Sequence, residues 1–190
     1  MLQWLPRILW LFLLATSYVN AKETSDSGWD INIEYKEARY YIHASYELKE
    51  NCDKVWDVLT DYEHLDQFIP NLKISHIISG RNAEGITRVE QRLRETFLIF
   101  HKHLHTILEV KEIDGCRIEF NAVDGDIPYY NGSWEIQTTP AGCILHYQSE
   151  SEPDTKLPRI FLNAVVRKSV RKNLTAVIEE VRRRSKTESP

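Results

Sequence analysis

Apolar and polar residues alternate along much of this chain, beginning in segment 31–48. Every second residue from Tyr40 to Leu48 is apolar, which is the period of a β-strand that buries one face. Turn signals such as Asp114-Gly115 separate the later apolar stretches. Together these features predict seven strands, over 31–48, 72–79, 86–97, 100–113, 117–123, 129–138 and 143–151.

Helical spacing replaces this alternation in two regions. Asn51 is a residue type that caps helices well, and apolar residues recur after it at intervals of three and four, with a break at Thr60-Asp61. These features predict two short helices. A longer apolar stripe follows Pro158, and it predicts one helix over about 157–184, roughly 40 Å long.

The order of these elements favours an α+β fold with a curved sheet. Seven strands side by side would be roughly 30 Å wide, whereas a helix is only about 10–12 Å across. One helix cannot cover the apolar face of a flat seven-stranded sheet, so we expect the antiparallel sheet to wrap around the long C-terminal helix. The two short helices that follow the first strand would close one end. The space inside is then either filled by large side chains or open to a ligand.

Large residues are predicted at many inward-facing positions, where they either fill this interior or line a pocket. Gln91 and Glu95 share the inward face of their strand with Val89 and Leu93, so they are candidate polar anchors in an apolar pocket. Because a buried carboxylate is costly, the alternative is that Glu95 reaches water near the strand end. The candidate ligand-binding residues are Trp56, Phe68, Gln91, Glu95, Phe120, Tyr130, Trp134, Tyr147 and Phe161.

Two stretches of the chain resemble a known superfamily. The runs VWDVLTDYEHLDQFIPNLKIS (55–75) and GSWEIQTTPAGCILHYQSESEP (132–153) resemble START-like (SRPBCC) proteins of the polyketide cyclase/dehydrase and coenzyme Q-binding protein type. The sequence LPR (157–159) and a long helix follow them, as in those families. This resemblance implies a helix-grip (START/Bet v 1-like) domain over 31–185. It also implies that lipophilic molecules such as quinones, lipids or polyketides bind between sheet and helix.

The first 21 residues have the features of a cleavable signal peptide. Arg7 precedes an apolar run over 8–19, and Ala21 ends a segment suited to cleavage by a signal peptidase. A spanning helix needs about 20 apolar residues, so this run is short for a membrane anchor, although an uncleaved anchor is the alternative. We therefore expect a protein exported to the periplasm or secreted, with a polar lead-in over 22–30 and a disordered tail over 186–190.

The charge distribution argues against one class of partner and suggests another. The chain has 24 Lys and Arg residues against 28 Asp and Glu residues, a net charge of −4 that does not suggest nucleic-acid binding. One face of the last predicted helix is basic, which suits transient contact with an anionic membrane surface. A solvated helix face is the alternative interpretation. The basic residues are Arg167, Lys168, Arg171, Lys172 and 182–184.

Three histidines form the strongest candidate for metal binding, but their surroundings do not support it. His101, His103 and His105 alternate on one predicted strand, a pattern that can supply two ligands to zinc. No cysteine or carboxylate accompanies them at ligand spacing, and the other face of the strand is apolar. We expect these histidines to face solvent and assign no metal site.

The three cysteines, Cys52, Cys116 and Cys143, do not suggest a disulfide framework. Their odd number excludes complete pairing within the chain. Cys116 and Cys143 follow turns at the same end of the predicted sheet but two strands apart. That separation is about 10 Å, beyond the roughly 7 Å over which a disulfide can form.

Catalytic motifs do not stand out in the sequence. It contains no nucleophile elbow, phosphate-binding glycine loop or two-cysteine metal motif, so no catalytic residue or cofactor is assigned. The sequence predicts an exported protein that binds or carries a lipophilic small molecule non-covalently. The alternatives are a cyclase or hydrolase that uses Glu95 or a histidine as acid or base, and an interaction module whose interior is filled.

Overall fold

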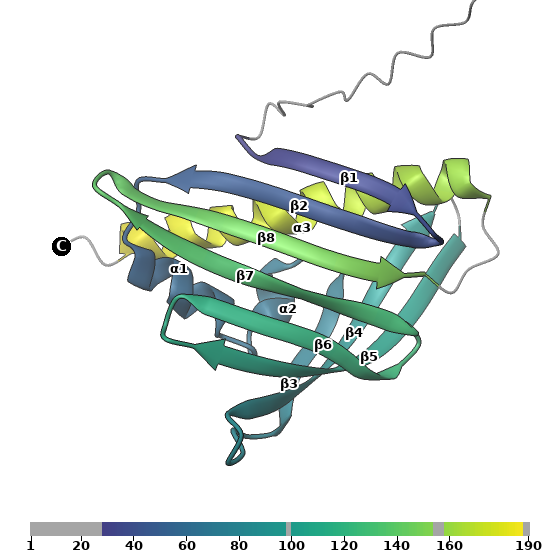
Figure 1. Ribbon diagram of the computed structural model, residues 1–190, viewed down its shortest axis with the longest axis horizontal. Helices are drawn as coiled ribbons and strands as arrows, with labels where there is room; N and C mark the ends of the chain where they lie inside the picture. Colours follow the sequence, from purple (N-terminus) through teal and green to yellow (C-terminus); the bar gives the residue numbers. More distant parts are fainter. Residues whose placement is uncertain (1–27, 98–99, 154–157, 188–190) are drawn as a thin grey trace, which may run out of the picture.

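A long helix lies across the concave face of a curved antiparallel sheet (Figure 1). The computed structural model describes residues 28–97, 100–153 and 158–187. Eight strands form the sheet in the order β1-β2-β8-β7-β6-β5-β4-β3. The elements are β1 (Asp30–Lys36), β2 (Arg39–Leu48), α1 (Cys52–Leu59), α2 (Leu65–Phe68), β3 (Leu72–Ser79), β4 (Ile86–Phe97), β5 (Phe100–Ile113), β6 (Arg117–Gly125), β7 (Tyr129–Thr139), β8 (Gly142–Glu152) and α3 (Arg159–Thr187). This arrangement confirms the predicted α+β helix-grip fold.

The sheet has one strand more than the sequence predicted. Segment 31–48 forms the β1–β2 hairpin rather than a single strand, and it turns at Glu37 and Ala38. Both residues have left-handed backbone angles, with φ of 52° and 66°. A two-residue hairpin turn of this kind normally carries Asn-Gly or Asp-Gly. Glu-Ala gives no such turn signal. The alternation of apolar and polar residues therefore appears continuous through the turn and predicts a single strand.

The edge hairpin also brings an N-terminal tryptophan into the core. Trp29, placed by its sequence position in the polar lead-in, is 1% exposed. Its ring lies 5.1 Å from that of Tyr46, and the next residue, Asp30, already pairs with Ser45 in the sheet. The predicted signal peptide falls outside the residues that the structure describes.

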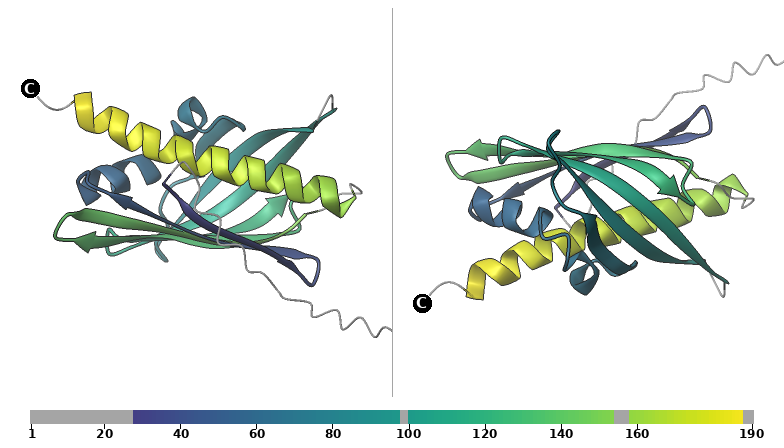
Figure 2. Two further views of the ribbon diagram at one scale, coloured as in Figure 1. Left: turned by 90° about the horizontal axis from the view of Figure 1, so that it is seen from above. Right: turned by 90° about the horizontal axis from the view of Figure 1, so that it is seen from below.

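The two short helices form where their sequence signals predict them. The Asn51 side chain caps α1 by accepting a hydrogen bond from the backbone N–H of Asp53 at 2.9 Å. The helix ends at Leu59. The hydroxyl of the next residue, Thr60, donates to the carbonyl of Trp56, and α2 follows after a turn. Helix α1 contacts both α3 and β7 and lies beside the C-terminal half of α3 (Figure 2).

The two halves of α3 have different environments. Buried residues occur only from Leu174 onward, whereas the side chains of 159–173 are half-buried or exposed. Two hydrogen bonds hold the helix along β2: Tyr40 donates to Asn163, and Arg182 donates to the Tyr46 hydroxyl. The C-terminal half is therefore packed on the core, while the N-terminal half covers the interior more loosely.

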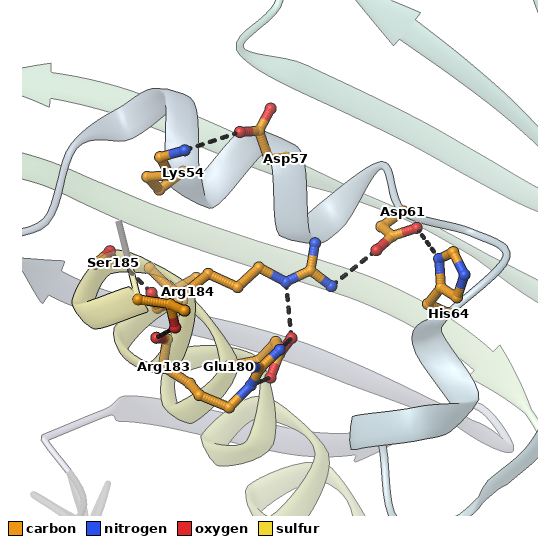
Figure 3. Close-up of polar contacts among 10 residues, drawn as sticks. Lys54, Asp57, Asp61, His64, Glu180, Arg183, Arg184 and Ser185 are labelled. Carbon is orange, nitrogen blue, oxygen red and sulfur yellow. Dashed lines mark hydrogen bonds and ion pairs between the residues drawn. The ribbon is translucent and has the colours of Figure 1, made fainter. Parts of the chain in front are cut away.

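A charged network fastens the C-terminal end of α3 to the loop between α1 and α2 (Figure 3). Glu180 is 7% exposed and accepts hydrogen bonds from Arg183 and Arg184 at 2.7 Å. Arg184 also donates to Asp61 at 2.8 Å, and Asp61 lies 2.6 Å from the Nδ1 atom of His64. This network therefore joins two elements that close the same end of the interior.

Both carboxyl groups of this network have lowered pKa values. For Glu180, the hydrogen bond from Arg183 is the largest influence, and with Arg184 it outweighs burial and lowers the pKa. For Asp61, burial acts first to raise the pKa, but hydrogen bonds from His64 and Arg184 together outweigh it. The folded state therefore favours the ionised form of both groups.

We expect acid to destabilise the protein through this network. A carboxyl group with a lowered folded pKa stabilises fully above its ordinary value, 4.5 for Glu180, and loses that stabilisation as the pH falls through the folded pKa. Replacing Glu180 with Gln should lower the free energy of unfolding at about pH 7 by roughly 1–2 kcal/mol and flatten its decline in acid. Urea unfolding across the acid range measures both effects.

The neighbouring Glu179→Gln variant is the control for this prediction, because Glu179 is exposed on the same helix turn. It should leave both the stability and its acid dependence close to those of the unmodified protein. An unchanged acid limb in the Glu180→Gln variant would contradict the assigned role of Glu180.

Candidate ligand-binding site

A cavity of about 580 Å³ lies between the sheet and α3. Its wall includes residues of β2 to β8, all three helices and the loops that join them, and most of these residues are apolar. Its volume falls within the range of about 300–1,000 Å³ found for pockets that hold small molecules. The interior is therefore partly open. Of the two possibilities, an interior filled by large side chains and one open to a ligand, the cavity favours the second.

The side chains of α3 that face the sheet explain why this space remains unfilled. Val165, Val166, Ser169 and Val170 line the cavity, and all four are short. They belong to the part of the helix in which no residue is buried. Short side chains on a loosely packed helix leave volume that longer residues would occupy.

Four aromatic rings cluster on the sheet side of the cavity. The Phe120 ring lies 5.1 Å from that of Tyr130 and 6.4 Å from that of Tyr147, and Trp134 lies 4.5 Å from Tyr147. Gly132 allows this packing, because a Cβ atom there would lie 2.7 Å from Phe120 Cζ and 2.3 Å from a neighbouring backbone carbonyl oxygen. The cluster gives the cavity an aromatic wall.

Most of the residues predicted for the pocket come together around this cavity. The Gln91 side chain belongs to the wall, as the alternation of its strand predicted, and lies among apolar neighbours. The predicted residues that line the cavity are Phe68, Gln91, Phe120, Tyr130, Trp134 and Tyr147.

Three predicted residues are not placed in the wall. Trp56 is half-buried and packs against the hydrophobic core instead of lining the cavity. Phe161 is 45% exposed at the beginning of α3, outside the cavity wall. Glu95 lies in β4 opposite Lys102, but its side chain falls outside the part that the structure describes.

The polar groups inside the cavity are predominantly uncharged. The hydroxyl groups of Tyr130 and Tyr147 lie 3.3 Å apart. Burial is the main reason that the pKa of each phenol is raised, so both stay protonated at neutral pH. Ser149 and Asn173 add a hydroxyl and an amide from β8 and α3, two contributions that the sequence patterns did not indicate.

Charged side chains in the wall lie where the cavity meets solvent. Among the described wall residues, the charged ones are Lys102 and Asp126, and both are exposed. Pro153 and Leu162 belong to the same wall, and Leu162 lies in the first turn of α3. We take this region, near the beginning of α3, as the mouth of the cavity.

The described histidine side chains of β5, those of His103 and His105, lie outside this site. His103 is exposed, and His105 Nε2 lies 3.1 Å from Glu90 on the neighbouring strand. Among the residues described, no group of three or more His, Cys, Asp or Glu side chains is arranged to hold a metal ion. The side chain of His101 lies outside that part of the chain.

The described part of the cavity wall holds few titratable side chains. Its described residues include no histidine and no cysteine, and their single carboxylate, Asp126, is exposed. General acid–base catalysis needs a titratable group within hydrogen-bond reach of the substrate.

In the described part of the chain, no helix is both long enough and apolar enough to span a membrane.

Solved structures of other proteins share this fold. A STAR-related lipid transfer protein from Xanthomonas axonopodis superimposes with a TM-score of 0.66 and 18% identity, covering 82% of this chain and 94% of its own. The ZhuI aromatase/cyclase from Streptomyces sp. R1128 has a TM-score of 0.62 and 18% identity, with 77% and 95% covered. A START superfamily protein from Mycobacterium smegmatis has a TM-score of 0.61 and 16% identity, with 75% and 97% covered.

Sequence comparison identifies the family directly. No curated protein matches this chain. Residues 51–178 match the family described as polyketide cyclase/dehydrase and lipid transport, a segment that includes α1, every strand from β3 to β8 and most of α3. This chain therefore belongs to the polyketide cyclase/dehydrase and lipid transport family, within the START-like superfamily.

Proposed function

We propose that this protein is an exported carrier that binds a lipophilic small molecule, such as a lipid, a quinone or a polyketide-like compound, without covalent chemistry. The observation that supports this function is the 580 Å³ apolar cavity beneath α3. Burying apolar ligand surface contributes about 25 cal/mol per Å² before ordering costs. The apolar run before Ala21 supports export, and the family includes lipid transport.

A cyclase is the second candidate function. The family description and the aromatase/cyclase among the structural relatives favour it. The described wall offers three protonated tyrosines, Tyr62, Tyr130 and Tyr147, and no histidine, so a cyclisation that needs a buried base has little support. A bell-shaped dependence of turnover on pH, with a polyketide substrate, would favour the cyclase.

Native mass spectrometry of protein purified from its own host tests the carrier function. We expect a mass increment that disappears after solvent extraction, and an extract that contains a lipophilic compound. The extracted protein should then take up a polarity-sensitive naphthalene dye, which the same extract displaces. A protein with neither a bound compound nor dye uptake would contradict the proposal.

The beginning of α3 is suited to membrane contact during loading. Ile160 is 74% exposed and Phe161 is 45% exposed, beside the mouth of the cavity. Lys168 and Lys172, both exposed, follow Phe161 by about two and three helical turns and lie on its side of the helix. Apolar residues next to cations favour an anionic bilayer surface. We propose that the carrier exchanges its ligand there.

Replacing both Ile160 and Phe161 with Ser should weaken binding to vesicles of phosphatidylcholine and phosphatidylserine by at least about tenfold, since it removes exposed apolar surface. Vesicle flotation measures the effect. The matched control replaces Ile77 and Ile78, exposed on β3, with Ser and should not change binding. Equal losses in both variants, or no vesicle binding by the unmodified protein, would contradict membrane loading.

A further inference from the structure

Two polar atoms in the cavity lack hydrogen-bond partners. Ser149 is 6% exposed, and its hydroxyl group makes no hydrogen bond with the described residues. The Oδ1 atom of Asn173 is buried and equally unpaired. Both residues line the cavity. Because buried polar groups in folded proteins are nearly always paired, these two atoms indicate where a bound molecule presents polar atoms of its own.

The sheet leaves the Ser149 hydroxyl open to the cavity. Ser149 pairs with Gly132 on β7, which has no side chain to bond with, and with Ile42 on β2. Tyr147 lies two residues earlier on the same face of β8. The hydroxyl groups of Tyr147 and Tyr130, which lie 3.3 Å apart, belong to the same wall.

The chemistry of these groups selects a kind of ligand. The carboxamide oxygen of Asn173 only accepts hydrogen bonds, so its partner must donate. A serine hydroxyl both donates and accepts, and a ligand hydroxyl matches both groups. A carboxylate does not fit, because it would face the Asn173 oxygen while the described cation of the wall, Lys102, is exposed at the mouth. A wholly apolar ligand would leave both atoms unpaired.

We propose that the cavity selects neutral lipophilic alcohols, whose hydroxyl group is held by Ser149 and Asn173. This inference rests on the proposed function and specifies its ligand class. The hydroxyl donates to Asn173 Oδ1 and accepts from, or donates to, Ser149 Oγ. The aromatic and aliphatic walls enclose the rest of the molecule.

Dye displacement with three probes of one chain length tests this specificity: a long-chain aliphatic alcohol, its methyl ether and the matching carboxylic acid. The alcohol should bind about tenfold more tightly than the ether or the acid, the ratio expected for one added hydrogen bond. Ser149→Ala and Asn173→Leu should each reduce this preference, and thermal unfolding shows whether the variants are folded. Ser79→Ala, exposed on β3 and outside the wall, is the control and should retain the preference.

The possible results separate this inference from the carrier function. Equal affinity for alcohol and ether, or tightest binding of the acid, would overturn the alcohol site and leave a lipophile-binding cavity. A preference that survives in both variants would assign the hydroxyl to other residues and also overturn it. Failure of all three probes and of the dye would overturn both proposals.

A second inference concerns two cysteines at the closed end of the sheet. Cys143 is 1% exposed near the start of β8, and Cys52 is the half-buried first residue of α1. Cys143 Sγ lies 3.6 Å from the carbonyl oxygen of Glu50, and Cys52 Sγ lies 3.5 Å from that of Gly142. Each sulfur thus approaches the backbone beside the other cysteine. Burial and direct interaction with Cys52 raise the pKa of the Cys143 thiol.

We infer that Cys52 and Cys143 form a disulfide bond when the protein meets an oxidant. Cys116 is not the partner, because it precedes β6 while Cys143 lies in β8, two strands away in the sheet. With oxidised glutathione as oxidant, the more accessible Cys52 first forms a mixed disulfide and releases one glutathione thiol. The Cys143 sulfur then displaces the second glutathione, so two thiols are oxidised and one glutathione disulfide is reduced. Cys116, exposed after β5, keeps its thiol.

Thiol titration of the denatured full chain tests this pairing after treatment with oxidised glutathione. One free thiol should remain, the mass should fall by two hydrogen atoms, and the melting temperature should rise by about 5–10 °C over the reduced protein. Cys116→Ser should leave no free thiol and keep the rise. Cys52→Ser and Cys143→Ser should each abolish the rise in melting temperature. Three persisting thiols, a retained glutathione adduct or a bridge through Cys116 would overturn the inference.

Discussion

Replacing Val166 with Trp and Val170 with Phe should reduce dye and ligand uptake by at least about tenfold, because both side chains then occupy the cavity. The two positions lie on the half of α3 in which no residue is buried, so the added rings have space to enter. We therefore expect the melting temperature to stay constant or to rise as the rings gain apolar contacts. Fluorescence titration and thermal unfolding measure the two quantities.

The control for this prediction places a tryptophan on the opposite side of the same helix. Ala164 is exposed and outside the cavity wall, so Ala164→Trp adds a ring without entering the cavity. It should leave uptake unchanged. If the filled variant still took up ligand with full affinity, the binding site would have to lie elsewhere, and the carrier function would lose its structural basis.

The fold was predictable because its dominant signals are local and repeated. Alternation defines the strands, the Asn51 cap and the Thr60 break define the short helices, and the width of one helix sets the need for curvature. The Glu37-Ala38 turn was missed for an equally local reason. Its left-handed angles are imposed by the pairing of β1 with β2, since neither residue favours them.

The candidate site was less predictable. The spacing of apolar residues shows which face of an element is buried, but it does not show whether that face packs on the core or lines the cavity. Trp56 follows the helical spacing but faces the packed core, and Phe161 lies in the apolar stripe of α3 yet is 45% exposed. The unpaired atoms of Ser149 and Asn173 leave no trace in a sequence pattern. Whether the two atoms are paired depends on the hydrogen-bonding groups that neighbouring elements place beside them. Only the three-dimensional arrangement shows those groups.

Replacing Leu145 with Ala should lower the free energy of unfolding by about 3–4 kcal/mol and the melting temperature by about 10 °C. Leu145 is 0% exposed on β8, between Tyr46 of β2 and Ile136 of β7. Truncation there leaves a void that the sheet on both sides cannot close. Denaturant and thermal unfolding measure the loss. Ile78→Ala removes as many atoms from a side chain that is 45% exposed, and should change stability by less than about 0.5 kcal/mol.

The same variant also separates the two parts of the interior. Leu145 belongs to the packed core and not to the cavity wall. Its truncation should leave the ligand affinity of the folded protein unchanged, in contrast to the filled Val166→Trp, Val170→Phe variant, which keeps stability and loses affinity. A parallel loss of affinity in Leu145→Ala would mean that core and cavity form one cooperative unit. Leu145→Ala should lose stability and keep affinity, and the filled variant should do the reverse. This contrast is expected if the core under the C-terminal half of α3 supplies stability and the N-terminal half of α3 covers the ligand.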